Sequence, residues 1–187
     1  MRVLSSRGTL FISVLPVSKA QLIVPAIFPA QFPMDSPDST LADRIPRENR
    51  IQIFSSLLRD VDSAWGQLSD PAKYCVVLAP TNPALHALPS KPWKEGPDVE
   101  AYGEQAYEGE AGITRANNNL KSFVERHVVL AKDWREGQKA KTISGLEVWW
   151  EQKDSSKVIQ PGDIKVVATA DEASNGEVWI LDSVVGK

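Results

Sequence analysis

The sequence predicts an α+β fold, with helices early in the chain and strands later. Two observations carry this prediction. Apolar residues recur at alternating spacings of three and four over residues 47–68, which is the period of an amphipathic helix. From residue 128 onward, short apolar runs are separated by turn residues instead, which is typical of antiparallel strands.

The composition is that of one globular domain with an N-terminal extension. The chain has 187 residues, of which 42% are hydrophobic and 24% charged, so a core can form without metal or disulfide support. A formal net charge of −3 argues against nucleic-acid binding, which needs clustered lysine and arginine. Cys75 is the single cysteine, which excludes an intramolecular disulfide and a multi-cysteine metal site. Because it lies in an apolar run, we expect a buried, unreactive thiol.

Residues 1–20 have the pattern of a secretory signal peptide. Two arginines precede an apolar run, and small residues then place a cleavage site after Ala20. A mitochondrial transit peptide and an uncleaved tail are the alternatives, because no acidic residue occurs before Asp35. Prolines interrupt the apolar stretch, which argues against a membrane-spanning helix.

Residues 21–46 contain five prolines and are expected to form an extended linker, so the folded domain is predicted over residues 47–187. Its first element is one helix over residues 47–68, ended by Asp70 and Pro71. The apolar stripe of this helix consists of Ile51, Phe54, Leu58, Val61, Trp65 and Leu68.

Residues 74–78 form a continuous apolar run, as expected of a strand covered on both faces. Pro80 ends that strand, because proline cannot donate a ladder hydrogen bond. A helix is expected to start at once, with Asn82 as its cap and Thr81 sharing the capping. Pro83 fits the first helical turn, where its missing N–H costs nothing. Caps and helix breakers therefore explain this abrupt corner without any catalytic function.

Residues 91–112 lack periodicity and are expected to form an acidic surface loop. Their carboxylates do not follow the spacing of a calcium-binding loop, so no calcium site is predicted. Trp93, Tyr102 and Tyr107 either fold the loop back onto the domain or form part of a contact surface.

The rest of the chain predicts a helix over residues 117–125 and strands over 128–130, 146–150, 164–169 and 178–185. Asn175 and Gly176 are expected to form a hairpin turn, because both residue types tolerate the positive φ of such turns. Asp182 lies in an apolar strand and is expected to be a buried carboxylate that accepts hydrogen bonds.

Four motifs in this order resemble the fasciclin domain, over roughly residues 51–185. The first is the apolar strand that runs through Ala79-Pro80-Thr81-Asn82 into a helix. The second is a histidine followed by two valines, at residues 127–129. The third is Thr-x-x-Gly before a strand, at residues 142–145, and the fourth is Asn175-Gly176 followed by an apolar strand that holds Asp182.

The resemblance implies a β-sandwich or wedge with helices packed around it, and a non-enzymatic adhesion or binding function. Single-domain members of this kind are most similar to those of fungi. The family's adhesion motif has an aromatic residue before the histidine, whereas Arg126 stands there in this chain. Integrin-type recognition is therefore not carried over. The resemblance also makes Asp182 an architectural residue.

No catalytic motif accompanies these features. The chain has two histidines, His86 and His127, and no serine elbow that a base could serve. His127 is therefore expected to be structural.

We predict a secreted or cell-surface interaction module, a monomer without metal or cofactor, whose partner is an unidentified protein or glycan. The alternative is an intracellular protein of the vacuole or mitochondrion. The candidate interaction residues are His127, Val128, Trp93, Tyr102 and Tyr107.

Overall fold

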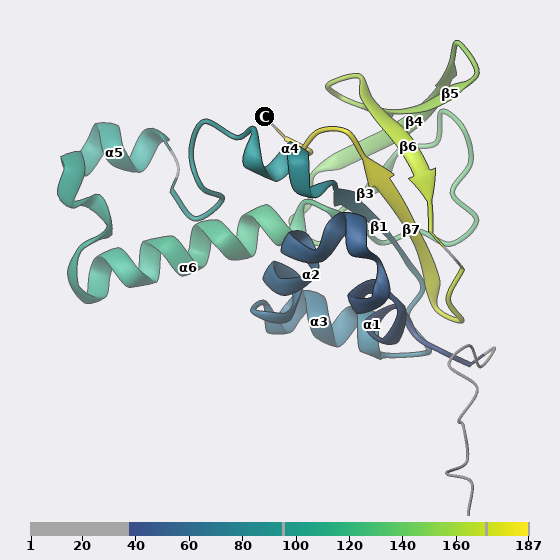
Figure 1. The fold of residues 1–187 in the computed structure, drawn as a ribbon, viewed down its shortest axis with the longest axis horizontal. Helices are drawn as coiled ribbons and strands as arrows, with labels where there is room; N and C mark the ends of the chain where they lie inside the picture. Colours follow the sequence, from purple (N-terminus) through teal and green to yellow (C-terminus); the bar gives the residue numbers. More distant parts are fainter. Residues whose placement is uncertain (1–37, 95, 171, 187) are drawn as a thin grey trace, which may run out of the picture. The chain divides into compact units, whose positions relative to one another are not determined.

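A computed structural model describes residues 38–94, 96–170 and 172–186 (Figure 1). The expected signal peptide and most of the expected linker lie outside these residues. Within them, helices pack against one mixed sheet of seven strands, which confirms the α+β prediction.

The folded domain begins earlier than expected. Residues 38–46 were predicted to be linker, but they include helix α1 (Leu41–Arg44) and the start of the 3₁₀ helix η1 (Ile45–Arg47). Leu41 and Ile45 are 0% and 1% exposed, so burial in the core fixes this segment despite its neighbouring prolines.

The helix expected over residues 47–68 is broken into three pieces. A 3₁₀ turn, η2 (Asn49–Ile51), leads into α2 (Gln52–Arg59), and α3 (Asp62–Ser69) follows. The break lies at Val61, whose backbone is extended with φ −118° and ψ 98°. The apolar stripe is confirmed except at Trp65, which is half-buried. The break changes the direction of α3, so that the smaller Ala64 faces the core instead.

The seven strands lie in the order β2-β1-β7-β6-β5-β4-β3. Their bounds are β1 (Cys75–Pro80), β2 (Val128–Val129), β3 (Ala140–Lys141), β4 (Glu147–Lys153), β5 (Ser156–Gln160), β6 (Ile164–Thr169) and β7 (Gly176–Leu181). The central pair β1 and β7 is parallel, and every other pair is antiparallel. Strand β5 was not predicted. It pairs with β4 through a two-residue turn at Asp154 and Ser155, both of which have positive φ.

The sheet curls until its two edges meet. Val129 of edge strand β2 forms a bridge with Thr142, which directly follows edge strand β3. The amide of Leu130 donates to the carbonyl of Lys141 at 2.9 Å. The amide of Ile143 donates to the carbonyl of Val128, also at 2.9 Å. This closure gives a wedge-like barrel and leaves little unpaired edge.

Both faces of the central strands β1 and β7 are buried, in two separate cores. Along β1, Cys75 and Val77 pack with the helices, whereas Val76 and Leu78 pack inside the curl. Strand β7 alternates in the same way, with Val178 toward the helices and Trp179 inside. The fully buried apolar run predicted for residues 74–78 is therefore confirmed, over Cys75–Pro80.

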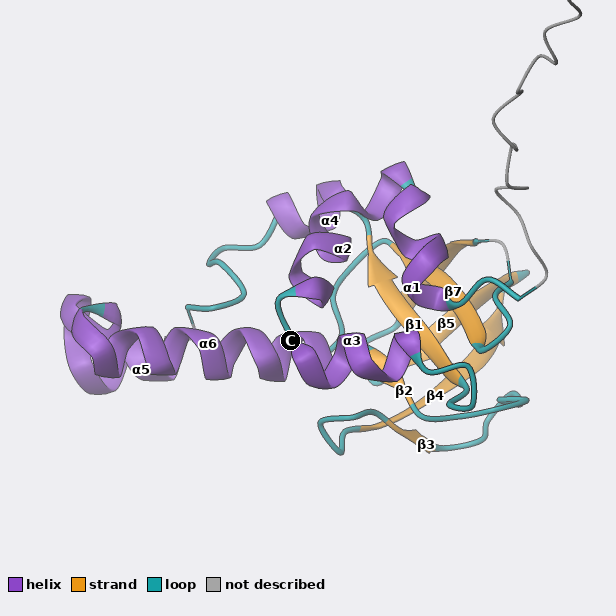
Figure 2. Cartoon of the chain, turned by 90° about the horizontal axis from the view of Figure 1, so that it is seen from below, coloured by secondary structure: helices purple, strands orange, loops and turns teal. Residues whose placement is uncertain are grey.

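The expected acidic loop is largely helical. After α4 (Asn82–His86), the chain forms α5 (Gly96–Tyr102), the 3₁₀ helix η3 (Gly103–Tyr107) and α6 (Gly109–Glu125). Helix α6 therefore starts eight residues before the predicted Asn117. Its first part leads away from the sheet to α5 (Figures 1 and 2). A helix without a core face carries no apolar stripe, which is why periodicity missed it.

The corner after β1 is built by caps, but only one of the two expected capping residues caps α4. Thr81, not Asn82, caps α4, because its hydroxyl accepts from the amide of Ala84 at 3.3 Å. The Asn82 side chain instead accepts from the amide of Ile53 at 3.0 Å and donates to the carbonyl of Asn49 at 2.9 Å. Asn82 therefore caps the N-terminus of α2, a neighbouring helix.

Asn175 forms a buried junction between the two ends of the domain. Its side chain accepts from the amide of Leu41 at 2.8 Å and donates to the carbonyls of Leu68 and Asp70 at 2.8 and 3.0 Å. Asn175 does not have the positive φ predicted for it. Gly176 is required for another reason: an added Cβ would lie 2.0 Å from the Cys75 carbonyl oxygen.

Replacing Asn175 by alanine is expected to lower the free energy of unfolding by about 2–3 kcal/mol, since a buried amide and a buried carbonyl lose their partner. Urea unfolding of Asn175→Ala measures this loss. The control is Asn118→Ala on the exposed side of α6, whose stability should be unchanged or slightly raised because alanine favours helix. Equal stability of the two variants would contradict the assignment of Asn175 as a junction.

Candidate functional site

Two of the five candidate interaction residues are buried. His127 and Val128 are both 0% exposed, so neither presents a side chain to a partner. The His127 ring donates from Nδ1 to the Phe123 carbonyl oxygen at 2.7 Å, and its Nε2 accepts from the Val185 amide at 3.1 Å. This histidine therefore fastens the C-terminal segment to the end of α6.

The same geometry decides what His127 can do chemically. Burial lowers the pKa of His127 to about 3, and the hydrogen bond to Phe123 only partly opposes this shift. Both ring nitrogens are occupied by backbone groups, which leaves neither available as a general base. The second histidine, His86, lies exposed on α4.

Asp182 was expected to be buried, and this prediction is wrong. The residue is exposed and follows the end of β7. Its Oδ1 accepts from the Lys165 amide at 3.1 Å, and its own amide donates to the Lys165 carbonyl at 3.1 Å. It thus extends the β6–β7 ladder beyond the last apolar pair, where the sheet rim meets water, and its architectural function needs no burial.

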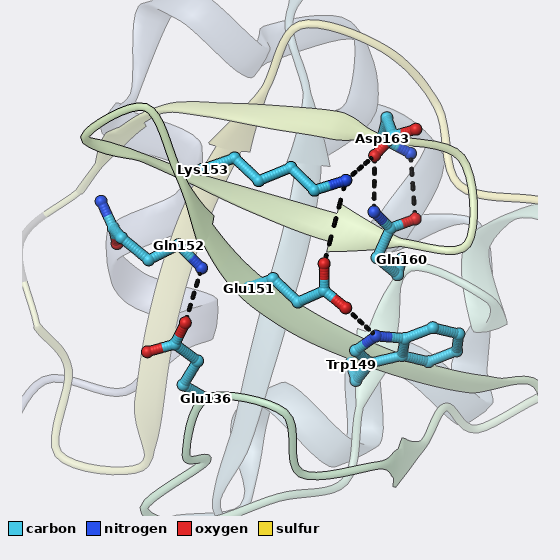
Figure 3. Close-up of polar contacts among 7 residues, drawn as sticks. All are labelled: Glu136, Trp149, Glu151, Gln152, Lys153, Gln160 and Asp163. Atoms are coloured by element: carbon cyan, nitrogen blue, oxygen red, sulfur yellow. Dashed lines mark hydrogen bonds and ion pairs between the residues drawn. The ribbon is translucent and has the colours of Figure 1, made fainter.

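A surface polar cluster on the β4–β5 hairpin is likewise structural (Figure 3). Glu151 accepts from the Trp149 indole at 2.8 Å, and Asp163 accepts from Lys153 and Gln160 at 2.5 Å each. The bond from Lys153 holds the pKa of the Asp163 carboxyl below its usual range. These carboxylates already accept hydrogen bonds from neighbouring side chains of the sheet, which supports a structural function for the cluster.

The aromatic residues of the expected loop lie on or near a projecting unit, which we call the arm. The arm consists of α5, η3 and residues 109–119 of α6 (Figures 1 and 2). One amide group, Nδ2 of Asn119, holds it together. It donates to Asp98 at 2.7 Å, to the Tyr107 hydroxyl at 3.2 Å and to the Trp93 carbonyl at 3.3 Å.

Three apolar side chains of the arm are exposed. Val99, Tyr102 and Ile113 are 43%, 59% and 60% exposed. Arg115 stacks its guanidinium 4.4 Å from the centroid of the Tyr102 ring and donates to the Ala106 carbonyl at 2.7 Å, which braces α6 against η3. Among the described residues, the other large exposed apolar side chains are Leu130 and Val167, which lie on the body of the domain.

The sequence predicted part of this arrangement. Tyr102 is exposed, whereas Tyr107 is half-buried against Asp98 and Trp93 is half-buried at the base of the arm. Val99 and Ile113 were missed, because an isolated apolar residue in a polar helix gives no periodic signal.

The part of the chain that the structure describes contains no group of three or more His, Cys, Asp and Glu residues able to hold a metal ion. Nor does any helix in the described ranges have the length and apolar character needed to cross a bilayer.

Comparison with known proteins matches residues 49–187 to the fasciclin domain. A FAS1 domain-containing protein of Neurospora crassa is 47% identical over 145 residues, which covers 77% of this chain and 64% of that protein. Another, of Aspergillus fumigatus, is 42% identical over 146 residues, covering 78% and 62% respectively. The chain thus spans less than two thirds of the length of these curated relatives.

A solved structure has a similar fold. The FAS1 domain pair from the insect cell adhesion molecule fasciclin I matches with a TM-score of 0.57, covering 80% of this chain and 51% of that one. The sequence identity is 13%, so this likeness concerns the fold alone.

Acid is expected to destabilise the domain through His127. The folded state holds the pKa of His127 at about 3 against an ordinary value of 6.5, so the unfolded chain binds the proton first as the pH falls. Between these two values the free energy of unfolding should fall by up to about 1.4 kcal/mol per pH unit from this group. Urea unfolding of wild type and His127→Gln at pH 7, 6 and 5 tests this, with His86→Gln as the control. The His127 variant should have a flatter pH profile than both. Parallel profiles for all three proteins would contradict it.

Proposed function

Because the chain belongs to the fasciclin domain family, we propose that it is a non-enzymatic adhesion or protein-interaction module that works outside the cell. The names of the fungal relatives state the domain only. Cell adhesion is stated for the insect protein of the same fold. The occupied nitrogens of His127 support a non-enzymatic function, because they remove the one buried base that the sequence offered.

The arm is the observation that carries this proposal. Its side chains Val99, Tyr102 and Ile113 remain exposed although the domain buries comparable residues elsewhere in two cores. Exposed apolar and aromatic side chains are what protein-contact surfaces use as anchors. Tyrosine is the residue type that most often anchors such contacts, because it buries a large ring at little conformational cost.

An extracellular location is part of the proposal. The N-terminal pattern with cleavage after Ala20 supports it. Cys75 is compatible with an oxidising compartment, because it is fully buried and burial raises the pKa of its thiol to about 12.

Adhesion is expected to depend on the arm. Fluorescent beads coated with the purified chain should bind fungal cells or beads carrying the same chain, and Tyr102→Ser with Ile113→Ser should weaken binding by about tenfold or more. The melting temperature should change little, because both side chains are exposed. A flow assay of bead attachment measures the effect.

The matched control is Leu130→Ser with Val167→Ser, which removes two apolar side chains that are 47% and 48% exposed from the body of the domain. This variant should attach as wild type does. Loss of attachment in the control but not in the arm variant would place the contact surface elsewhere and reject the arm.

The secreted product is expected to start at Gln21. The full chain with a C-terminal tag, expressed in a fungal host, should yield this N-terminus from the medium by protein sequencing. Tagged protein found only in mitochondria or vacuoles, or Met1 retained in the cytosol, would favour the intracellular alternative.

A further inference from the structure

An apolar hollow of about 280 Å³ lies at the base of the arm, between helix α2 and the turn formed by residues 91–94. The Lys94 amide donates to the Lys91 carbonyl at 2.8 Å, which closes this turn. Five apolar side chains line the hollow: Ile53 and Leu57 of α2, Leu85 of α4, and Pro92 and Trp93 of the turn. Its volume lies just below the roughly 300–1,000 Å³ of sites for drug-sized ligands, and it suits one large side chain.

The mouth of this hollow is basic. Lys91 is exposed, and it is the one charged residue among the described residues that line the hollow. Residues 82–94, which supply α4 and the turn, contain two lysines and no aspartate or glutamate. A side chain that enters the hollow therefore passes a positive charge, which favours a partner with carboxylates beside its apolar contact.

The arm has the complementary properties. Residues 96–119 contain five carboxylates and one basic residue, Arg115, which gives this segment a net charge of −4. Tyr102 is 59% exposed, and the exposed Glu100 lies two residues before it. The arm thus presents one large aromatic side chain within an acidic segment.

Tyr102 does not fill the hollow of its own chain. Its ring lies beside the Arg115 guanidinium, which is 4.4 Å from the ring centroid. Arg115 in turn donates to the Ala106 carbonyl, and Asn119 donates to Asp98 of α5. Because these contacts keep the ring on the arm, a hollow that receives it belongs to another molecule.

We propose that the arm of one copy docks in the apolar hollow of a second copy, with the Tyr102 ring inserted against Leu57 and Trp93. Carboxylates of the arm, Glu100 among them, then lie near Lys91 at the mouth, where opposite charges favour the approach. Each copy carries both the ring and the hollow, so the contact forms between identical molecules. This inference rests on the proposed adhesion function, for which it names the partner as the chain itself.

A single docked arm makes a small contact. One inserted aromatic ring buries about 150–250 Å² of its own surface, whereas a stable interface buries roughly 800 Å² on each partner. We therefore expect a monomer in dilute solution, as the sequence predicted, and self-association over about 10 µM to 1 mM. Many copies on one surface would combine such weak contacts into firm attachment.

Analytical ultracentrifugation of the full chain over this concentration range tests the proposal. The weight-average mass of wild type should rise with concentration. The arm variant, Tyr102→Ser with Ile113→Ser, lacks the inserted ring. The hollow variant, Ser56→Glu with Lys91→Glu, places two carboxylates at the mouth, where they repel the acidic arm. All four residues are exposed, so both variants should fold, and each should associate about tenfold or more weakly than wild type.

A mixture of the two variants tests the docking directly. The hollow variant still has a wild-type arm, and the arm variant still has a wild-type hollow. The two should therefore form a one-to-one complex at concentrations where neither associates alone. A fluorophore on one variant lets its sedimentation report this complex.

The matched control is Gln152→Glu with Lys141→Glu, which changes the net charge as the hollow variant does. Both residues are exposed on strands, away from the hollow. This variant should associate as wild type does. Equal weakening in the control and in the hollow variant would mean that only net charge acts, and would overturn the proposal.

Two further results would reject the docking, and both leave adhesion to be judged separately. One is a mixture of the two variants that does not associate. The other is wild type that stays monomeric at the highest concentration while arm-dependent attachment to fungal cells holds, in which case the arm binds a different molecule. Conversely, self-association that needs both arm and hollow, without any bead attachment, would support the docking and reject the adhesion function.

Discussion

The parallel pairing of β1 with β7 is the constraint on which the rest of the structure depends. The two strands run side by side over six residue pairs, from Cys75 opposite Gly176 to Pro80 opposite Leu181. Both strands bury both of their faces, and each therefore contributes to the helix-facing core and to the core inside the curl. Pairing can start only because Gly176 lacks a side chain where it meets the Cys75 carbonyl. A side chain there would separate the strands at their first pair.

The ends of the domain are then attached to this central pair by buried polar residues. Asn175, one residue before β7, holds the amide of Leu41 in α1 and the carbonyls that end α3. His127, one residue before β2, holds the amide of Val185 beyond β7. Both side chains have all their strong hydrogen-bonding atoms paired in the interior, where an unpaired polar atom would be costly. Because hydrogen bonds depend on geometry, these two side chains fix which chain segments meet. The apolar cores on either side supply most of the stabilisation.

The sequence predicted best where side chains are both periodic and buried. The stripe of Ile51, Phe54 and Leu58 and the strand at Cys75–Pro80 follow directly from apolar spacing, and both are confirmed. The breaks were missed because they depend on tertiary contacts. The turn at Val61 lets α3 pack its apolar residues into the core on the helix side of the sheet. The polar start of α6 has no apolar stripe and is held by the hydrogen bonds of Asn119 and Arg115. The order of strands, and above all the parallel pairing, cannot be read from local pattern, since pairing partners lie about a hundred residues apart.

At the candidate site, too, some features follow from local sequence pattern and others depend on tertiary contacts. Tyr102 stands out in the sequence as an aromatic side chain in a polar segment, and it is exposed, whereas Asp182 is exposed where a buried carboxylate was expected. His127 was expected to be structural, and its burial and its two hydrogen bonds to backbone groups agree with that expectation. Asp182 is exposed because it follows Leu181, the last residue of β7, at the end of the β6–β7 ladder.

The connection between body and arm explains why two hollows remain beside the turn formed by residues 91–94. Pro89, Pro92 and Pro97 punctuate the segment that leaves α4. Proline donates no backbone hydrogen bond and its ring disrupts a helix interior, so this segment neither prolongs α4 nor adds a strand to the sheet. It crosses instead as a single turn closed between Lys91 and Lys94, with space on either side. The residues beneath, Leu57 and Leu85 on one side and Phe123 on the other, are therefore covered by one turn where a regular element would have filled the space. The same prolines that interrupt this segment leave the apolar lining on either side of the turn accessible.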